Sequence, residues 1–274
     1  DVMVVFDRSG SMVEDDGSGR SKIETARDAV SLFVQLVQAG TGNRVGLVSF
    51  ATTATSPVDF PIAAVSNASK NSLIGGPPFA GGVVGGLLPG GATSIGEGLD
   101  AARLQFPAPG SNPRAILLLT DGMQNRPRFI DEVEGDLGAI AVHAIGFGTE
   151  ANLDGEVLTA LAAAHEGLYM RAGNGLALEK FFTQAFGSIF EAGVLFDPEF
   201  ALAANADGEP IGFPVCAEEV ITAVIGWDRP DASLRIELTT PGGAVVSPAA
   251  AGVLTATGRT WSFLRVPLPH GGER

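Results

Sequence analysis

The chain has 274 residues, which suits one large or two modest globular domains, because single cores usually divide beyond roughly 250 residues. Its 31 acidic and 17 basic residues give a formal net charge of −14, which argues against nucleic-acid partners and against a basic membrane-binding surface. Hydrophobic residues make up 45% of the chain, enough for a packed core, while the single cysteine, Cys216, permits neither an intrachain disulfide nor a cysteine-based zinc site.

Apolar runs alternate with helical patterns along the first 193 residues. Val2 to Phe6 is a continuous apolar run, typical of a strand covered on both faces, and residues 22–39 repeat apolar positions at helical spacing. Further strands are expected at 44–50, 55–60, 115–119, 139–147 and 167–170, and further helices at 94–106, 129–138, 153–161 and 176–190. This alternation predicts an α/β fold with a doubly wound, mostly parallel sheet and helices on both faces, a Rossmann-like arrangement.

Two other features complete this part of the chain. The Gly- and Pro-rich residues 61–91 are expected to form a long loop with one helical turn at 68–74. No apolar run approaches the roughly 20 residues that a spanning helix needs, so we expect no membrane span in this chain.

The pattern changes near residues 193–205. Residues 234–239 alternate apolar and polar side chains with period two, which predicts a half-buried strand, and Trp261, Phe263 and Val266 lie on further extended segments. We therefore expect two domains, one over residues 1–193 and a small antiparallel β module over residues 194–274, whose completeness the sequence does not decide.

Hydroxyl and carboxyl side chains follow the expected strands of the first domain. The first strand ends in Asp7, with Ser9 and Ser11 two and four residues later; Asp121 follows the strand at 115–119, and Thr93 precedes a helix. Ligands gather at the carboxyl ends of strands in such sheets, so these side chains are expected to converge. Their oxygens suit Mg²⁺ or Mn²⁺, with Ca²⁺ as another hard cation, better than Zn²⁺ or Cu²⁺. Taken singly, each residue equally suits a turn or a helix start.

Together these residues resemble the metal-ion-dependent adhesion site (MIDAS) of the von Willebrand factor type A domain, which is integrin I-like. The matching positions are Asp7, Ser9, Ser11, Thr93 and Asp121, in the family's order. The phrases at 43–50 and 145–148 are also similar to the family, and the resemblance covers about residues 1–193. More loosely, residues 234–243 resemble β-sandwich modules that follow such domains in some bacterial proteins and in calcium-activated chloride channel regulators.

The resemblance implies roles for the five residues. Ser9, Ser11 and Thr93 would bind the metal directly, while Asp7 and Asp121 would act largely through water. A cation with few bonded carboxylates stays electron-poor, so the acidic side chain of a partner protein can complete its coordination. The resemblance therefore implies a non-enzymatic, metal-dependent binding or adhesion module, whose partner presents Asp or Glu.

Other functions remain as alternatives. The first is an accessory subunit of an intracellular ATPase-driven machine, as in metal chelatases, and the second is a metal-assisted hydrolase. The sequence offers no convincing catalytic acid, base or nucleophile, so we expect no enzyme. An extracellular or cell-surface location is favoured over a cytoplasmic one. The partner, the compartment, the oligomeric state, the particular ion and whether the chain is a fragment stay open.

Overall fold

A six-stranded sheet forms the centre of the computed structural model, which describes residues 1–108, 110, 112–194, 196–216 and 218–270. The strand order is β3-β2-β1-β4-β5-β6, and all neighbours are parallel except β2 and β3, which are antiparallel. The strands are β1 (Val2–Asp7), β2 (Arg44–Phe50), β3 (Phe60–Ala64), β4 (Ala115–Thr120), β5 (Ala141–Phe147) and β6 (Tyr169–Ala172). The doubly wound, mostly parallel sheet predicted from the sequence is confirmed.

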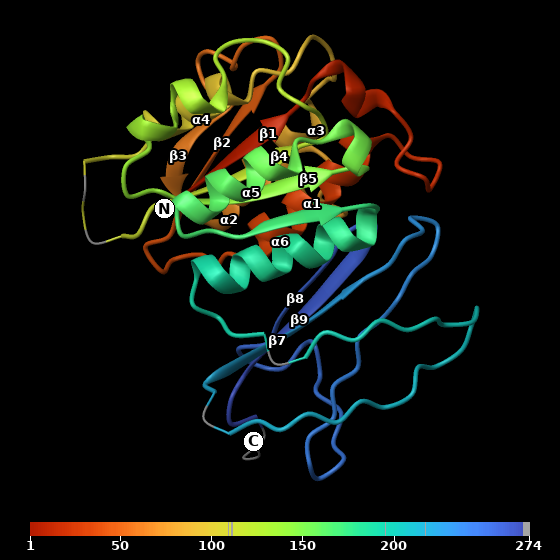
Figure 1. Cartoon of the computed structure of the whole chain (residues 1–274). Helices are drawn as coiled ribbons and strands as arrows, with labels where there is room; N and C mark the ends of the chain where they lie inside the picture. Colours follow the sequence, from red (N-terminus) through yellow and green to blue (C-terminus); the bar gives the residue numbers. More distant parts are fainter. Residues whose placement is uncertain (109, 111, 195, 217, 271–274) are drawn as a thin grey trace.

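Helices cover both faces of this sheet (Figure 1). On one face lie α1 (Lys22–Leu36), α2 (Asn67–Ile74), α3 (Gly82–Gly85) and α6 (Gly175–Ile189). The other face carries α4 (Ile95–Arg103), α5 (Gly155–Ala164) and the 3-10 turns η2 (Ile130–Glu132) and η3 (Glu134–Asp136). Two more 3-10 turns are η1 (Gly10–Val13) and η4 (Glu150–Asn152).

The continuous apolar run of β1 reflects burial on both sides of the sheet. Val4 and Phe6 belong to the hydrophobic cluster on the α1 face, and Met3 and Val5 belong to the cluster on the α4 face. All four are 0% exposed. Because successive strand residues point to opposite faces, a strand covered on both sides needs apolar residues at every position.

Several predicted boundaries were wrong in detail. The expected strand at 55–60 lies instead at β3, where Pro61 is tolerated because β3 is the edge strand of the described sheet and pairs with β2. The expected long loop at 61–91 contains the end of β3 together with α2 and α3, and the expected helix at 129–138 is two 3-10 turns. The helix expected at 153–161 is α5, which begins later because Asp154 caps it: the Asp154 carboxylate accepts the Val157 amide at 3.2 Å.

A second, antiparallel sheet follows in the C-terminal part. Its order is β7-β9-β8, from β7 (Val220–Gly226), β8 (Leu254–Thr257) and β9 (Trp261–Pro267). The strand predicted at 234–239 was wrong: only an isolated bridge, Thr239 to Val245, forms there. Ile236 and Leu238 still pack against the buried cluster under β9, so the period-two pattern marks half-burial without a hydrogen-bonded ladder.

The β7-β9-β8 sheet packs against α1 and α6, and Figure 1 shows it in blue beside these two helices. Trp261 and Phe263 of β9 lie in one buried cluster with Leu32 and Leu36 of α1. Polar contacts accompany this packing: the Trp261 indole donates to the Asp28 carbonyl at 3.0 Å, Arg259 Nε donates to Asp28 Oδ1 at 3.0 Å, and Arg265 Nη2 donates to the Leu36 carbonyl at 2.7 Å.

Glu179 of α6 is buried at the same contact. The Thr260 hydroxyl donates to Glu179 Oε1, whereas Oε2 has no hydrogen-bond partner among the described residues. Burial raises the pKa of Glu179 well above its usual range; the Thr260 hydrogen bond opposes the shift and the nearby Asp28 charge adds to it. The folded protein therefore holds this proton more tightly than the unfolded chain does.

The wild-type protein is expected to lose stability as the pH rises, because Glu179 must then ionise while buried. We expect the substitution Glu179→Gln to reduce this loss. For a carboxyl whose folded pKa is raised, stability is fully present below the unfolded pKa and is lost as the pH rises through the folded pKa. Urea unfolding between pH 5 and pH 9 should show the wild-type free energy of unfolding falling more steeply than that of the variant. Glu209→Gln, at an exposed carboxyl, is the matched control. Parallel pH profiles for wild type and Glu179→Gln would refute this expectation.

The described residues contain no helix that is both long and apolar enough to cross a bilayer.

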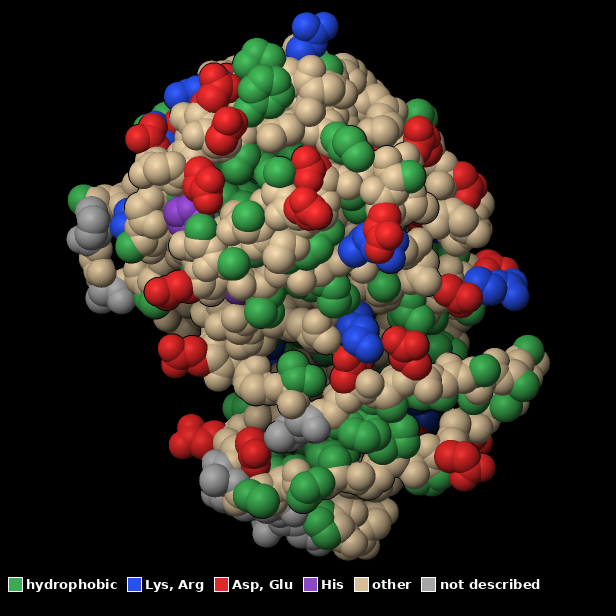
Figure 2. Space-filling view, in the orientation of Figure 1, with side chains coloured by type: hydrophobic (Ala, Val, Ile, Leu, Met, Phe, Trp, Pro, Cys, Tyr) green, Lys and Arg blue, Asp and Glu red, His purple; other side chains and the backbone are tan. Residues whose placement is uncertain are grey.

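Exposed apolar side chains gather over the irregular segment that precedes β7, in the lower part of Figure 2. Among the residues that precede β7, Phe196, Phe200 and Ile211 are 52%, 55% and 44% exposed.

Candidate metal centre

The candidate site lies at the point where the strand order of the main sheet reverses. β1 and β4 are neighbours at the middle of the sheet, and the chain leaves them toward opposite sides. Such a switch point opens a crevice at the carboxyl ends of the two strands, where α/β proteins bind their ligands. Asp7 is the last residue of β1, and Asp121 directly follows β4.

The Asp7 carboxylate is held in place by both strands. Its Oδ1 accepts the Ser9 amide at 2.7 Å, and its Oδ2 accepts the Thr120 hydroxyl at 2.6 Å. Asp7 is 0% exposed. The hydrogen bond from the Ser9 amide to Asp7 accompanies a turn of the chain immediately after β1, so Ser9 and Ser11 lie beside the end of the strand.

Three hydroxyls lie near Asp121 and the following Gly122. Ser11 Oγ donates to Asp121 Oδ1 at 2.7 Å and lies 3.1 Å from Ser9 Oγ. A Cβ placed on Gly122 would lie 3.6 Å from Thr93 Oγ1 and 3.7 Å from Ser11 Oγ. The structure therefore brings all five residues predicted from the sequence to the same edge of the sheet.

The Gly-rich segment before Thr93 makes this approach possible. Gly90 N donates to the Arg8 carbonyl at 2.8 Å, and Gly10 N donates to the Gly91 carbonyl at 3.0 Å, so this loop is bound directly to the turn after β1. Gly91 has φ +89°, and a Cβ there would lie 2.8 Å from Thr52 Oγ1, so a side chain would not fit. Thr93 itself is 3% exposed, and its amide donates to Asn125 Oδ1 at 3.0 Å.

Two carboxylates in one buried site repel each other. Burial raises the pKa of Asp7 to about 6, and the charge of Asp121 adds to this shift, against the lowering effect of the Thr120 and Ser9 hydrogen bonds. A bound cation would relieve this repulsion. The electrostatics therefore favour a positive charge at this point.

Sequence reasoning missed one residue of the site, Lys22. Its Nζ donates to Asp121 Oδ2 at 2.9 Å and to Glu14 Oε2 at 2.7 Å, and the side chain is buried. Burial alone would lower the pKa of Lys22, but the hydrogen bonds and charges of Asp121 and Glu14 raise it above its usual value. The sequence carries no more signal for this contact than the position of Lys22 at the first residue of α1.

The donor set fits a hard divalent cation. It consists of two carboxylates and three hydroxyls, and oxygen ligands of this kind suit Mg²⁺, Mn²⁺ or Ca²⁺. Within the described ranges, no group of three or more His, Cys, Asp or Glu side chains could hold a metal ion. A metal at this edge of the sheet would therefore depend on the hydroxyls as much as on the carboxylates.

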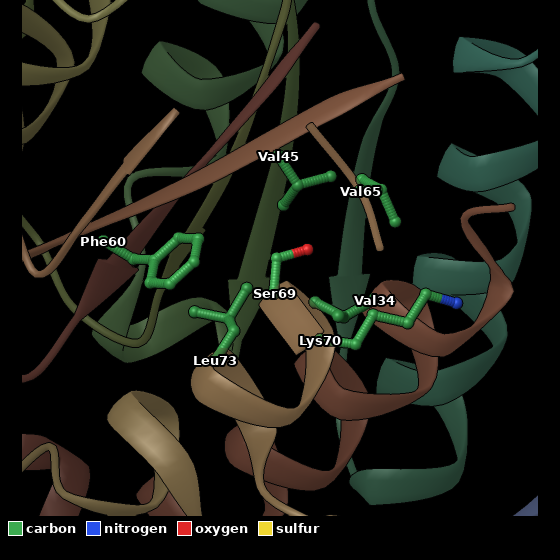
Figure 3. A pocket seen from close by; sticks show the side chains of 7 residues that line it. All are labelled: Val34, Val45, Phe60, Val65, Ser69, Lys70 and Leu73. Carbon is green, nitrogen blue, oxygen red and sulfur yellow. The ribbon is translucent and has the colours of Figure 1, made fainter. Parts of the chain in front are cut away.

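The cavity in Figure 3 lies apart from the candidate metal site and is mainly apolar. It has a volume of about 10 Å³, roughly the space of one water, and is lined mainly by apolar side chains between α1, α2 and the edge of the sheet. None of its lining residues belongs to the candidate site. This cavity is too small to hold an organic ligand.

Comparisons with known proteins support the fold described above. Residues 2–124 match the family model of the von Willebrand factor type A domain. No curated protein matches the chain. Among solved structures, the conserved hypothetical protein BatB from Bacteroides thetaiotaomicron is similar with a TM-score of 0.56 and 21% identity, over 70% of this chain and 98% of that chain.

Two further structures share the fold. A von Willebrand factor type A protein from Catenulispora acidiphila has a TM-score of 0.55 and 20% identity, over 69% of this chain and 42% of its own. Proximal thread matrix protein 1 from the mussel byssus, solved with a zinc-occupied MIDAS motif, has a TM-score of 0.53 and 20% identity, over 68% of this chain and 46% of its own. At these identities the similarities show the fold.

Proposed function

We propose that this chain is a non-enzymatic binding protein that captures an acidic side chain of a partner protein through a divalent metal ion. Residues 1–193 would form the von Willebrand factor type A domain and residues 194–274 an accessory β module. The observation that carries the proposal is the convergence of Asp7, Asp121 and three hydroxyls where the strand order reverses. The match to a family that commonly mediates metal-dependent protein interactions supports it.

Each donor has a role in this proposal. Ser9, Ser11 and Thr93 would contact the metal, and Asp7 and Asp121 would hold its bound waters. The hydrogen bonds of the carboxylates support this division, because both oxygens of Asp7 and both oxygens of Asp121 already accept from protein donors. Mg²⁺ keeps several waters when few carboxylates bind it, and one of these waters would give way to the partner's Asp or Glu.

Exposed apolar side chains near the site favour a protein partner over a small ligand. Val13, Leu88 and Met123 are 64%, 72% and 47% exposed, and each lies on a loop that carries a site residue. Apolar side chains around a central polar contact are the usual composition of a protein interface. We propose an extracellular or cell-surface location for this interaction, as in adhesion or the assembly of a surface complex.

The proposal predicts that Ser9→Ala weakens Mg²⁺ binding by about tenfold or more, since it removes one direct ligand among few. Isothermal titration with Mg²⁺ measures this, and Ser31→Ala, which removes a buried hydroxyl of α1 bonded to the Phe79 carbonyl, is the matched control. Partner capture from the source cell should require Mg²⁺ and fail with EDTA or with Ser9→Ala. Capture that survives both changes would refute the mechanism, and Mg²⁺-dependent co-purification of an ATPase would favour the accessory-subunit alternative.

A further inference from the structure

Lys22 places a fixed positive charge inside the candidate site. The side chain is 6% exposed, and its ammonium group binds Asp121 Oδ2 at 2.9 Å while Ser11 binds the other oxygen of the same carboxylate. Lys22 therefore does not lie at the rim of the site: it is bonded to one of its two acidic groups.

The position of Lys22 is fixed by its surroundings. Its amide donates to the Glu14 carbonyl at 2.9 Å, and Ser21 and Glu24 form a capping box that fixes the start of α1 around it. Further along α1, Asp28 binds both Arg20 and Arg259. The ammonium group is thus delivered to Asp121 from a helix end that is anchored on several sides.

The charges of the buried groups decide what this ammonium does to a bound metal. Asp7 and Asp121 supply two negative charges, which a divalent cation alone would neutralise. With Lys22 included, the metal-loaded site has a net charge of +1. Glu14, the other partner of Lys22, is 56% exposed at its side chain, so water and salt screen its charge far more than that of Asp121.

We propose that Lys22 adjusts the site for anion capture: it weakens the binding of the metal alone and strengthens the binding of a carboxylate by the metal-loaded site. This inference rests on the proposed function. Its physical basis is that the ammonium repels the dication and competes for Asp121, and that it leaves a positive charge which a partner's carboxylate neutralises. Lys22 is a positioning residue in this scheme and binds neither the metal nor the partner.

The test measures two affinities in the full chain. Mn²⁺ binding is followed by the electron paramagnetic resonance signal of the free ion, and acetate binding to the Mn²⁺-loaded protein by the loss of water-proton relaxation enhancement. In Lys22→Gln, we expect the dissociation constant for Mn²⁺ to fall by about tenfold or more and that for acetate to rise by about tenfold, since a unit charge within a few ångströms is worth at least this much at an effective dielectric constant of about 20.

Further variants separate charge from structure. Lys22→Met, which fills similar space without charge or donors, must shift both affinities in the same directions as Lys22→Gln. Glu14→Gln leaves the buried pair intact and should change either constant by less than about threefold, and only at low salt. A purely structural role for Lys22 would lower stability without moving the two affinities in opposite directions.

The outcomes also separate this inference from the proposed function. If wild-type protein binds Mn²⁺ and acetate but the Lys22 variants bind both with unchanged constants, or lose both, the inference about Lys22 is overturned and the proposed function stands. If wild-type protein does not bind Mn²⁺, the inference and the proposed function fail together. Tighter Mn²⁺ binding with weaker acetate binding in both Lys22 variants supports the inference.

Discussion

Asp7→Asn is expected to abolish the binding of Mg²⁺ while stabilising the metal-free protein at neutral pH. The substitution removes one of two repelling buried carboxylates and keeps the shape of the side chain. Burial and the Asp121 charge raise the pKa of Asp7 from 3.8 to about 6, a cost of roughly 3 kcal/mol to the folded state at pH 7. Asn loses one of the two hydrogen bonds to Ser9 and Thr120, so we expect a net gain of about 2 kcal/mol.

The same carboxyl sets a pH dependence. Because its folded pKa is above its unfolded pKa, the stability that Asp7 contributes is fully present below pH 3.8 and is lost as the pH rises through about 6. Mg²⁺ competes with this proton, so its stabilising effect should be strong at pH 7.5 and small at pH 5.

Thermal unfolding at these two pH values, with Mg²⁺ or with EDTA, measures both expectations. Asp131→Asn, which changes an exposed acidic residue, should behave as wild type in all four conditions. A Mg²⁺-dependent shift in the midpoint that persists in Asp7→Asn would contradict the role given to Asp7.

Trp261→Ala is expected to cost about 3–5 kcal/mol of stability, the usual range for removing a large buried aromatic side chain. Trp261 is 0% exposed, and its ring stacks on Phe79 with centroids 5.7 Å apart. Its indole also donates a hydrogen bond to the Asp28 carbonyl of α1, and the substitution would remove this buried hydrogen bond.

Urea unfolding of the whole chain measures this loss and shows how the two sheets depend on each other. Because Trp261 of β9 packs against Leu32 and Leu36 of α1, we expect its removal to shift the unfolding of the main sheet as well. Phe200→Ala, at an aromatic residue that is 55% exposed, is the control and should change stability little. If Trp261→Ala shifts only a separate C-terminal transition, the contact between β9 and α1 contributes nothing to the main sheet.

The main sheet and the grouping of the site residues could be predicted because both follow from local patterns. Continuous apolar runs such as Val2 to Phe6 and Ala115 to Leu119 mark strands that are buried on both faces. Once these strands are neighbours in a parallel sheet, the residues after them meet at one edge. The spacing of Asp7, Ser9 and Ser11 then supplies the rest of the pattern.

The C-terminal sheet could be predicted only in part. β9 was expected as an extended segment, but β7 was missed although Val220 to Ile225 is largely apolar, and residues 234–239 were assigned to a strand that does not form. Period-two alternation of apolar and polar residues indicates that one side of a segment is buried. A segment that packs one side against a cluster of side chains shows this alternation whether or not it forms the hydrogen bonds of a β-sheet.

No local pattern in the sequence predicts the contacts of Lys22 with Asp121 and of Trp261 with Asp28. They join residues 99 and 233 positions apart in the chain. Nothing in the sequence around Lys22 distinguishes a lysine that turns into the site from one that lies in solvent. Such pairs are set by how α1 packs on the sheet and on β9, which becomes visible only in three dimensions.

The most direct measurement of the metal site is anomalous diffraction from crystals of the whole chain grown with Mn²⁺. The proposed site predicts a single strong peak about 2.1–2.2 Å from Ser9 Oγ, Ser11 Oγ and Thr93 Oγ1, with Asp7 and Asp121 reaching the ion through water. A fully formed site without a peak, or a peak bound elsewhere on the chain, would contradict it.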